Sequence, residues 1–367
     1  MSQELYYQIA LSLTPNIGAV KAKSLIDHFG TAENVFTASV KEMMSLENIG
    51  KIVSDSIKKF NDRKIVEEEI AFIEKYKIKT LFITDEAYPK RLLNCYDPPT
   101  LLYFKGNVNF NTEKTISIVG TRNNTVYGKE ITEKIVEELS DKNITIISGL
   151  ATGIDVIAHK AAVKNKIATI GVMGNGLKTI YPSTSKSIAT EMLENGGVLT
   201  EFTHTTKPDK HNFPKRNRIV AGMSDAVIVI ETSVKGGSMI TAEIANGYNR
   251  DVFAVPGKVT DSKSAGCNYL IQNNKAFLFS SVNDFLFMMG WNEEQQVNKK
   301  KKQAEIFYTL SEDEKIIVDI LREKENVHID AITVQSGFTS SKLAAVMLQL
   351  ELQNIIKSLP GKLFTLY

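Results

Sequence analysis

Few features of this 367-residue sequence suggest a secreted, membrane-bound or metal-binding protein. Its two cysteines, Cys95 and Cys267, lie far apart and match no metal-ligand spacing, so we expect buried thiols in a reducing compartment rather than a disulfide. No apolar run approaches the roughly 20 residues that span a bilayer, and the N-terminus lacks the basic start and apolar core of a signal peptide. We therefore expect a cytoplasmic protein without membrane contact.

Motifs of common nucleotide-dependent enzymes and hydrolases are also missing. No Gly-Lys-Ser/Thr follows a glycine loop at Walker spacing, and Gly174-Asn175-Gly176 lacks the third glycine of a dinucleotide fingerprint. There is no Gly-x-Ser-x-Gly elbow and no His-Glu-x-x-His. We therefore expect no ATP hydrolysis, no metal and no cofactor.

The net charge is small, +2 at pH 7, which argues against a protein that coats DNA through bulk charge. Positive charge is concentrated locally instead. Between Glu201 and Arg218, five lysines and arginines stand against two acidic residues. The last six residues, Phe213–Arg218, read Phe-Pro-Lys-Arg-Asn-Arg. An aromatic ring can stack on a base and cations can pair with phosphates, so a ring beside cations is the least that a site for single-stranded nucleic acid needs.

Hydrophobic periodicity divides the chain into four regions. They are a helical region 1–105, an alternating strand and helix region 110–291, a linker 292–304, and a C-terminal region 305–367. In the helical region, Asn16-Ile17-Gly18 and Asn48-Ile49-Gly50 each resemble the turn of a helix-hairpin-helix, whose backbone N–H groups bind a phosphate. A small helical domain that contacts proteins, with ordinary glycine turns, is the alternative.

The alternating region is typical of βαβ units, and we predict an α/β fold with an extended Rossmann-like parallel sheet. The expected strands are Ile116–Val119, Ile144–Ser148, Ile167–Val172, Val198–Glu201, Ala226–Glu231, Val252–Val255 and Ala276–Phe279. The expected helices are Gly128–Leu139, Ile154–Val163, Thr184–Glu194 and Met239–Tyr248. Glycines cluster where these strands end, as in sheets that bind ligands at their carboxyl edge.

The C-terminal region shows three helical stripes followed by a hairpin pattern, which predicts a winged helix. From Asn292 onward, ten lysines and arginines stand against eleven acidic residues. Because this region has no basic surplus, its charge does not support DNA binding by the winged helix, and a protein-contact role is the alternative.

Several residues near strand ends are candidate anion ligands. The candidate glycine-loop residues are Gly120, Ser148, Gly149, Gly174, Gly176, Gly236, Gly237 and Ser238. Arg122 follows the first strand and either forks two hydrogen bonds onto a phosphate or pairs with a carboxylate. Asp155 and His159 share one helical face, as an acid–base pair or, more simply, as a structural pair.

Six segments, in order over residues 115 to 280, resemble the DNA-processing protein A (DprA/Smf) family. They are Ile118–Arg122 with Tyr127-Gly128, Ser148–Asp155 with His159, Gly174–Gly176 with Tyr181-Pro182, Phe213–Arg218, Gly236–Ala242, and Val255–Gly257. The flanks resemble the family too, with a small helical domain related to sterile-alpha-motif or hairpin-helix modules and a C-terminal winged helix.

The resemblance implies a single-stranded DNA-binding recombination mediator that protects incoming DNA and loads the bacterial recombinase in natural transformation, without catalysis. It places the strand pocket at Arg122, Lys210 and Phe213, completed by Arg216, Asn217 and Arg218. The implied partners are single-stranded DNA, recombinase A, a second copy of the chain as a homodimer, and single-strand-binding protein.

Two positions depart from the family pattern and leave small-nucleotide binding at the glycine-lined edge open. Asn175 stands where the residue is often smaller, and Gly236 stands where serine is common.

An enzyme is the competing interpretation. The glycine-rich sheet also resembles nucleotide phosphoribohydrolases of the cytokinin-activating type, with a base over Gly236-Gly237 and Glu243 or Glu231 as the catalytic acid. The long basic segment has no obvious use on so small a substrate. A nucleotide-binding sensor that signals through the winged helix is a third interpretation.

Overall fold

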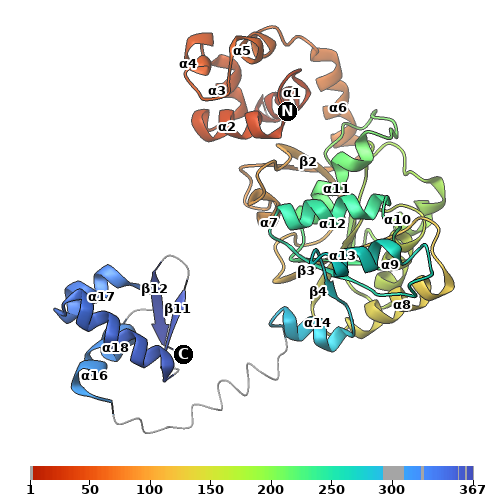
Figure 1. The fold of residues 1–367 in the computed structure, drawn as a ribbon. Coiled ribbons are helices and arrows are strands. Elements are labelled where there is room, and N and C mark those ends of the chain that lie inside the picture. Colours follow the sequence, from red (N-terminus) through yellow and green to blue (C-terminus); the bar gives the residue numbers. More distant parts are fainter. Residues whose placement is uncertain (1–2, 292–309, 324–325, 354, 360–361, 367) are drawn as a thin grey trace. The chain divides into compact units, whose positions relative to one another are not determined.

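A computed structural model describes residues 3–291, 310–323, 326–353, 355–359 and 362–366. The chain divides into two compact units, Met1–Trp291 and Asn292–Tyr367 (Figure 1). The predicted linker 292–304 lies outside the described residues. Within the described ranges, no helix is both long enough and apolar enough to cross a membrane.

The first unit begins with six helices joined by short turns. They are α1 (Gln3–Leu13), α2 (Ala19–Phe29), α3 (Ala32–Thr37), α4 (Val40–Met44), α5 (Lys51–Lys58) and α6 (Arg63–Tyr76). The two turns that resemble each other in sequence also share one conformation. Asn16 and Asn48 both have positive φ, 65° and 66°, and each is followed by a glycine that N-caps the next helix. The Asn16 amide donates to the hydroxyl of Ser56, 3.1 Å away, so the two hairpins lie together.

A nine-stranded sheet follows, in the order β1-β2-β6-β5-β4-β3-β7-β8-β9. Its strands are β1 (Lys79–Phe82), β2 (Leu101–Asn107), β3 (Lys114–Val119), β4 (Ile144–Ser148), β5 (Thr169–Val172), β6 (Gly196–Thr200), β7 (Ala226–Val229), β8 (Asp251–Ala254) and β9 (Phe277–Leu278). All pairings from β6 to β9 along this order are parallel. Every strand predicted from the sequence lies in this parallel part, which confirms the Rossmann-like class.

The first two strands correct one prediction, because residues 1–105 are not helical throughout. β1 and β2 join the sheet as an antiparallel extension of β6. Their apolar residues, Leu101 to Phe104 above all, are buried in the same core as the helices before them. The short strands escaped detection because a four-residue apolar run has no period that separates a strand from a helix.

Helices cover both faces of the sheet. They are α7 (Lys90–Leu93), α8 (Val126–Glu138), α9 (Ile154–Lys164), α10 (Lys186–Glu191), α11 (Asn212–Gly222), α12 (Gly237–Gly247), α13 (Ala265–Gln272) and α14 (Val282–Met288), with a 3-10 turn at Ser183–Ser185. Successive strand residues enter different cores: Ile118 packs with α8, α9 and α14, whereas Val119 packs with α11 and α12. This alternation is the period of two that a sheet covered on both faces requires.

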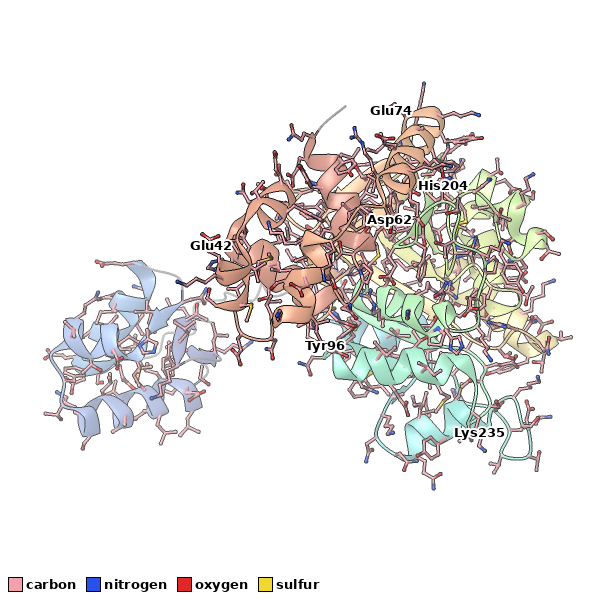
Figure 2. The ribbon with its side chains drawn as sticks, turned by 90° about the horizontal axis from the view of Figure 1, so that it is seen from above. Glu42, Asp62, Glu74, Tyr96, His204 and Lys235 are labelled. Carbon is pink, nitrogen blue, oxygen red and sulfur yellow. The ribbon has the colours of Figure 1, made fainter. Side chains whose placement is uncertain are left out.

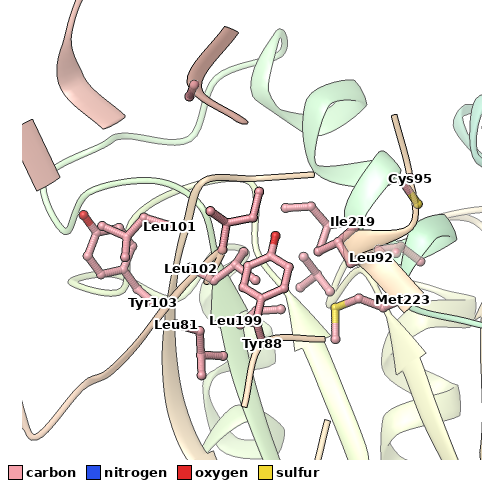
Figure 3. Packing of buried hydrophobic residues seen from close by; sticks show 14 of the residues in the cluster. Leu81, Tyr88, Leu92, Cys95, Leu101, Leu102, Tyr103, Leu199, Ile219 and Met223 are labelled. Atoms are coloured by element: carbon pink, nitrogen blue, oxygen red, sulfur yellow. The ribbon is translucent and has the colours of Figure 1, made fainter. Parts of the chain in front are cut away.

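Helix α11 packs against the hydrophobic core through its buried apolar residues. Figure 3 shows Ile219 of this helix and its C-cap Met223 beside Leu92 of α7, Tyr88 of the loop before α7, and Leu199 of β6. The Tyr88 ring is buried and its hydroxyl donates to the carbonyl of Pro99, 2.5 Å away. The segment around β1 and β2 therefore fixes the helix that carries the predicted basic residues.

The two cysteines are buried and free, which confirms their expected core role. Cys95 packs near α11, and Cys267 lies in α13.

The second unit is a winged helix, as predicted. Its elements are α16 (Glu312–Glu323), β10 (Val327–His328), α17 (Ile329–Ser336), α18 (Ser340–Leu352), β11 (Ile356–Leu359) and β12 (Leu363–Leu366). The three strands pair in the order β10-β12-β11. Ile317, Ile332, Leu343 and Leu350 meet in its own small core.

Replacing Gly106 in β2 with alanine should strongly destabilise the first unit. Gly106 has φ 142°, and an added Cβ would lie 2.0 Å from the carbonyl oxygen of Gly196 in β6. We expect Gly106→Ala to lower the free energy of unfolding by about 2–5 kcal/mol, measured by urea denaturation. The control is Gly247→Ala in α12, where nothing lies within 4 Å of an added Cβ. It should change stability by less than about 1 kcal/mol. Equal effects of the two changes would contradict the tight β2–β6 pairing.

Candidate nucleic-acid interface

A hollow of about 490 Å³ opens at the carboxyl ends of β3, β4 and β7. β3 pairs with β4 on one side and β7 on the other, so the chain leaves the sheet in opposite directions there. Crevices at such a switch point are where open α/β sheets bind ligands. Helices α11 and α12, which lie side by side in Figure 1, form the opposite wall.

The basic segment forms the first turns of α11, which no pattern in the sequence predicted as a helix. His211 is its N-cap, and Pro214 stands in the first turn. Backbone N–H groups in the first turn have no partner within the helix, so a proline there costs no hydrogen bond. Phe213, Arg216 and Asn217 all line the hollow, because residues three and four apart share a helical face. Lys210, just before the helix, lines it as well.

The three residues of the expected strand pocket come together. The half-buried ring of Phe213 faces the exposed Arg122 from the β3 loop, whose guanidinium carbon lies 5.4 Å from the ring centroid. Across the described ranges, Arg122 forms no ion pair with a carboxylate, which favours its predicted role as a phosphate ligand. Lys210 lines the same hollow. A ring face and two cations therefore border one opening.

Arg216 is placed differently from the prediction. Its side chain is buried, with the residue 4% exposed, and its guanidinium donates to the carbonyls of Gly149 and Val172. Burial lowers the pKa of Arg216 to about 10, while the nearby Asp155 carboxylate opposes that shift. Arg216 therefore remains charged at neutral pH and lies in the wall of the hollow. It adds positive potential to the hollow, and its donors hold strand-end carbonyls rather than an incoming phosphate.

Arg218 also departs from the prediction, because its guanidinium points away from the hollow. It forms an ion pair with Glu201 and donates to the carbonyl of Asp97. One helical step of about 100° separates its direction from that of Asn217. Asn217 does line the hollow, where its amide donates to the carbonyl of Gly237 at 3.4 Å and joins α11 to α12.

Five of the candidate glycine-loop residues border the hollow: Gly120, Gly149, Gly236, Gly237 and Ser238. The last three open α12, whose first N–H groups have no partner within the helix. The Ser238 hydroxyl, in a residue only 6% exposed, has no hydrogen-bond partner among the described residues. This end of the hollow is therefore equipped to receive an anion.

The other three candidates serve packing. The Ser148 hydroxyl donates to the carbonyl of Ile118 at 2.6 Å. An added Cβ would lie 2.8 Å from the Phe213 ring at Gly174, and 2.0 Å from the carbonyl oxygen of Thr203 at Gly176. Gly174 thus makes room for the stacking ring, and neither Ser148 nor Gly176 lines the hollow.

The two departures from the family pattern have local explanations. Asn175 is buried, and its amide donates to the carbonyls of Gly176 and Thr179, so it holds the turn after β5. At Gly236, an added Cβ would lie 2.2 Å from the hydroxyl of Thr232, so this chain's threonine leaves no room for a serine there.

No acid–base pair forms between Asp155 and His159 in the described structure. His159 is fully buried, and its Nδ1 lies 2.7 Å from the hydroxyl of Thr169. Burial lowers the pKa of His159 to about 3, so the ring is neutral. Asp155 lines the hollow, and burial raises its pKa although Arg216 opposes the shift.

Neither glutamate of the competing enzyme interpretation lines the hollow. Glu231 is fully buried, and its carboxylate accepts from the backbone N–H and the hydroxyl of Thr125, at 2.9 and 2.5 Å. Glu243 is exposed and pairs with Lys275 at 3.7 Å. Glu231 therefore anchors the loop that carries Arg122, a role that the sequence did not reveal.

A second anchor holds the segment that leads to Lys210. The buried carboxylate of Glu69 in α6 accepts from the backbone N–H of His204 and lies 2.6 Å from its ring Nδ1. The Phe72 ring stacks on the same imidazole, with centroids 4.4 Å apart. Figure 2 shows His204 beside the helix that runs between Asp62 and Glu74. Burial raises the pKa of Glu69, and its bonds to His204 oppose that shift.

Family sequence models cover most of the chain. The family described as DNA recombination-mediator protein A matches residues 79–290, from β1 to the end of α14. The DprA winged helix domain matches residues 303–362, and a helix-hairpin-helix motif matches residues 8–70. The last two matches confirm the predicted N-terminal and C-terminal fold types.

Individual proteins give the same picture. The chain is 31% identical to Protein Smf of Synechocystis over 395 residues, with 98% of each covered. It is 41% identical to DNA processing protein DprA of Bacillus subtilis over 209 residues, which are 57% of this chain and 70% of that protein.

Solved structures of DNA processing protein A are also similar to this chain. The X-ray structure of DNA processing protein A from Streptococcus pneumoniae has a TM-score of 0.63 at 33% identity and covers 78% of this chain and 98% of that one. DNA processing protein A from Helicobacter pylori, whose structure describes a single-stranded DNA binding mode, has a TM-score of 0.53 at 32% identity and covers 58% of this chain and 96% of that one.

The buried neutral imidazole makes a pH-dependent prediction. Because the folded-state pKa of His159, about 3, lies below the ordinary histidine value of 6.5, the unfolded chain binds the extra proton first as pH falls. The contribution of His159 to stability is therefore complete above pH 6.5 and is lost toward pH 3. Urea denaturation at several pH values should show that His159→Gln, which cannot titrate, removes up to about 1.4 kcal/mol per pH unit of this dependence. Identical pH dependence in the two proteins would contradict a buried neutral ring.

Proposed function

This chain belongs to the DNA recombination-mediator protein A family, and from that premise we propose that it binds single-stranded DNA in the hollow between β3 and β7. In natural transformation it would act as a recombination mediator, which protects incoming strands and passes them to the recombinase without catalysing a reaction. The observation that carries the proposal is the meeting of Arg122, Lys210 and Phe213 at one opening.

The proposed grip combines stacking with ion pairing. A base lies against Phe213, whose half-buried ring lines the hollow. Arg122 and Lys210 neutralise backbone phosphates, and the start of α12 with Ser238 receives a further anion. The buried charge of Arg216 strengthens attraction of the polyanion without direct contact. Stacking and phosphate contacts are both independent of sequence, which suits a protein that must accept any incoming strand.

The lining of the hollow disfavours the hydrolase alternative. Asp155 is the one carboxylate that the described residues contribute to it, and its Oδ2 accepts from the backbone N–H of Ala151 at 3.4 Å. Glu231 and Glu243 lie elsewhere, engaged with Thr125 and Lys275. A nucleotide hydrolase needs a carboxylate free to act on the bound sugar or base.

Three further assignments are proposals that rest on family membership. We propose that recombinase A receives the strand and that single-strand-binding protein shares it. We also propose a cytoplasmic location, which the two free buried cysteines support because reducing compartments keep thiols unpaired.

A homodimer is proposed on the free edge of the sheet. β9 is the last strand of the order, with Phe277 and Leu278 exposed on it, and the adjacent α14 exposes Phe287 and Met288. Large apolar side chains beside unpaired backbone groups favour association with an identical edge. A second copy of this chain is the occupant that the proposal commits to.

The DNA assignment predicts two distinguishable losses in fluorescence anisotropy with labelled oligothymidylate across a salt series. Neutralising two phosphate ligands, by Arg122→Gln with Lys210→Gln, should make the log–log salt slope less steep by about 1.4, at about 0.7 per phosphate. Phe213→Ala should weaken binding by about 1–3 kcal/mol and leave the slope unchanged, because a neutral ring releases no counterions.

The matched control is Lys160→Gln with Lys164→Gln on α9. Both are exposed, and neither lines the hollow. This double change should alter the slope little. Wild-type affinity and slope in the Arg122 and Lys210 double variant would end the assignment of this hollow to DNA.

The edge proposal predicts a monomer after Leu278→Glu with Phe287→Glu. Charges at a paired apolar edge repel across the interface, so light scattering after size exclusion should give half the mass of the wild type. The control places glutamate at Met44 and Ile52, which are exposed apolar residues of the N-terminal helices. A wild-type monomer at micromolar concentration, or an unchanged dimer in the edge variant, would refute the proposed interface.

A further inference from the structure

We propose that Tyr181 is a second stacking platform, which receives the base adjacent to the one held by Phe213. This inference rests on the proposed function, because it concerns the same bound strand. It is drawn from a small adjoining hollow that Tyr181 lines.

The small hollow, of about 120 Å³, adjoins the large one. Tyr181, Gly174 and Pro182 line it together with Arg122 and Phe213, and the last two also line the large hollow. Phe213 and Arg122 therefore form the partition between two adjacent openings. A strand that places one base in the large hollow must lead its neighbour past this partition, because consecutive nucleotides are covalently joined.

The rings of Tyr181 and Phe213 are neighbours and are tilted relative to each other. Their centroids are 6.0 Å apart and their planes differ by 31°. Tyr181 is 49% exposed, although Phe213 is half-buried beside it. A single exposed ring is ordinary on a protein surface. An exposed ring that lies next to a predicted base-stacking ring and a cation can receive the neighbouring base of a single strand.

The segment that carries Tyr181 is fixed before any strand binds. On one side, the buried amide of Asn175 donates to the carbonyl of Thr179 at 2.6 Å. On the other, the buried hydroxyl of Ser185 donates to the carbonyl of Leu150 at 3.2 Å, in the loop after β4. Buried polar anchors at both ends hold the ring in place, so little conformational entropy is lost when a base stacks on it.

The role of the Tyr181 ring is tested by oligothymidylate binding to Tyr181→Ala, Tyr181→Leu and Tyr181→Phe. Removing the aromatic face in the first two should weaken binding about 5- to 150-fold with the salt slope unchanged. Tyr181→Phe should restore affinity to within about 2-fold, since stacking needs the ring and not the hydroxyl. Leucine keeps apolar bulk without a π face, so it separates stacking from local packing, and thermal melting confirms that each variant folds.

A strand with one base removed tests contact directly. A single abasic site is moved along a short oligothymidylate, one position at a time. At one position the missing base should lower the affinity of the wild-type protein but leave the affinity of Tyr181→Ala unchanged, because the effects of removing two groups in contact are not additive. If no position shows this cancellation, or if Tyr181→Leu binds like wild type, the platform is refuted. Should Tyr181→Ala keep full affinity while Phe213→Ala loses it, only this inference fails. Full affinity in both variants would instead overturn the proposed function.

Discussion

The buried guanidinium of Arg216 is the constraint on which the interface depends. It bonds to the carbonyl of Gly149 after β4 and to that of Val172 at the end of β5, so it fixes α11 to the carboxyl edge of the sheet. Once this contact sets the rotation of the helix, Phe213 and Asn217 must face the hollow, because they share its helical face. A buried cation is costly unless its donors are engaged, and strand-end carbonyls engage these donors. Arg216, which the sequence suggested as a phosphate ligand, thus holds α11 against the sheet.

The remaining binding groups reach the hollow from other elements, each held by its own buried carboxylate. Glu231 after β7 bonds to Thr125 and restrains the loop that carries Arg122. Glu69 of α6 bonds to His204 and restrains the segment that carries Lys210. The N-terminal helices therefore contribute to the interface without lining it. Strands β1 and β2, which extend the sheet, share a hydrophobic core with α11. Preorganised side chains bind a flexible strand with less loss of freedom on the protein side.

The sequence predicted the parallel strands well because all of them except the exposed β9 are short, largely buried apolar runs, as at Ile144–Ser148. It missed β2, where Leu101–Phe104 has the same composition but stands among helices and returns antiparallel. The family resemblance identified Arg122, Lys210 and Phe213, which do converge. It grouped Arg216 and Arg218 with them because a linear basic segment does not reveal which side of a helix each residue faces. The anchoring roles of Glu69 and Glu231 could not be predicted, because their partners, His204 and Thr125, are more than a hundred residues away in the sequence.

The most direct test of this account is the crystal structure of the full chain with a short oligothymidylate. The account predicts one base against the Phe213 ring in the hollow between β3 and β7, with phosphates within hydrogen-bond distance of Arg122 and Lys210. A strand bound only along the hairpin turns or the winged helix, with that hollow holding no nucleotide, would contradict it.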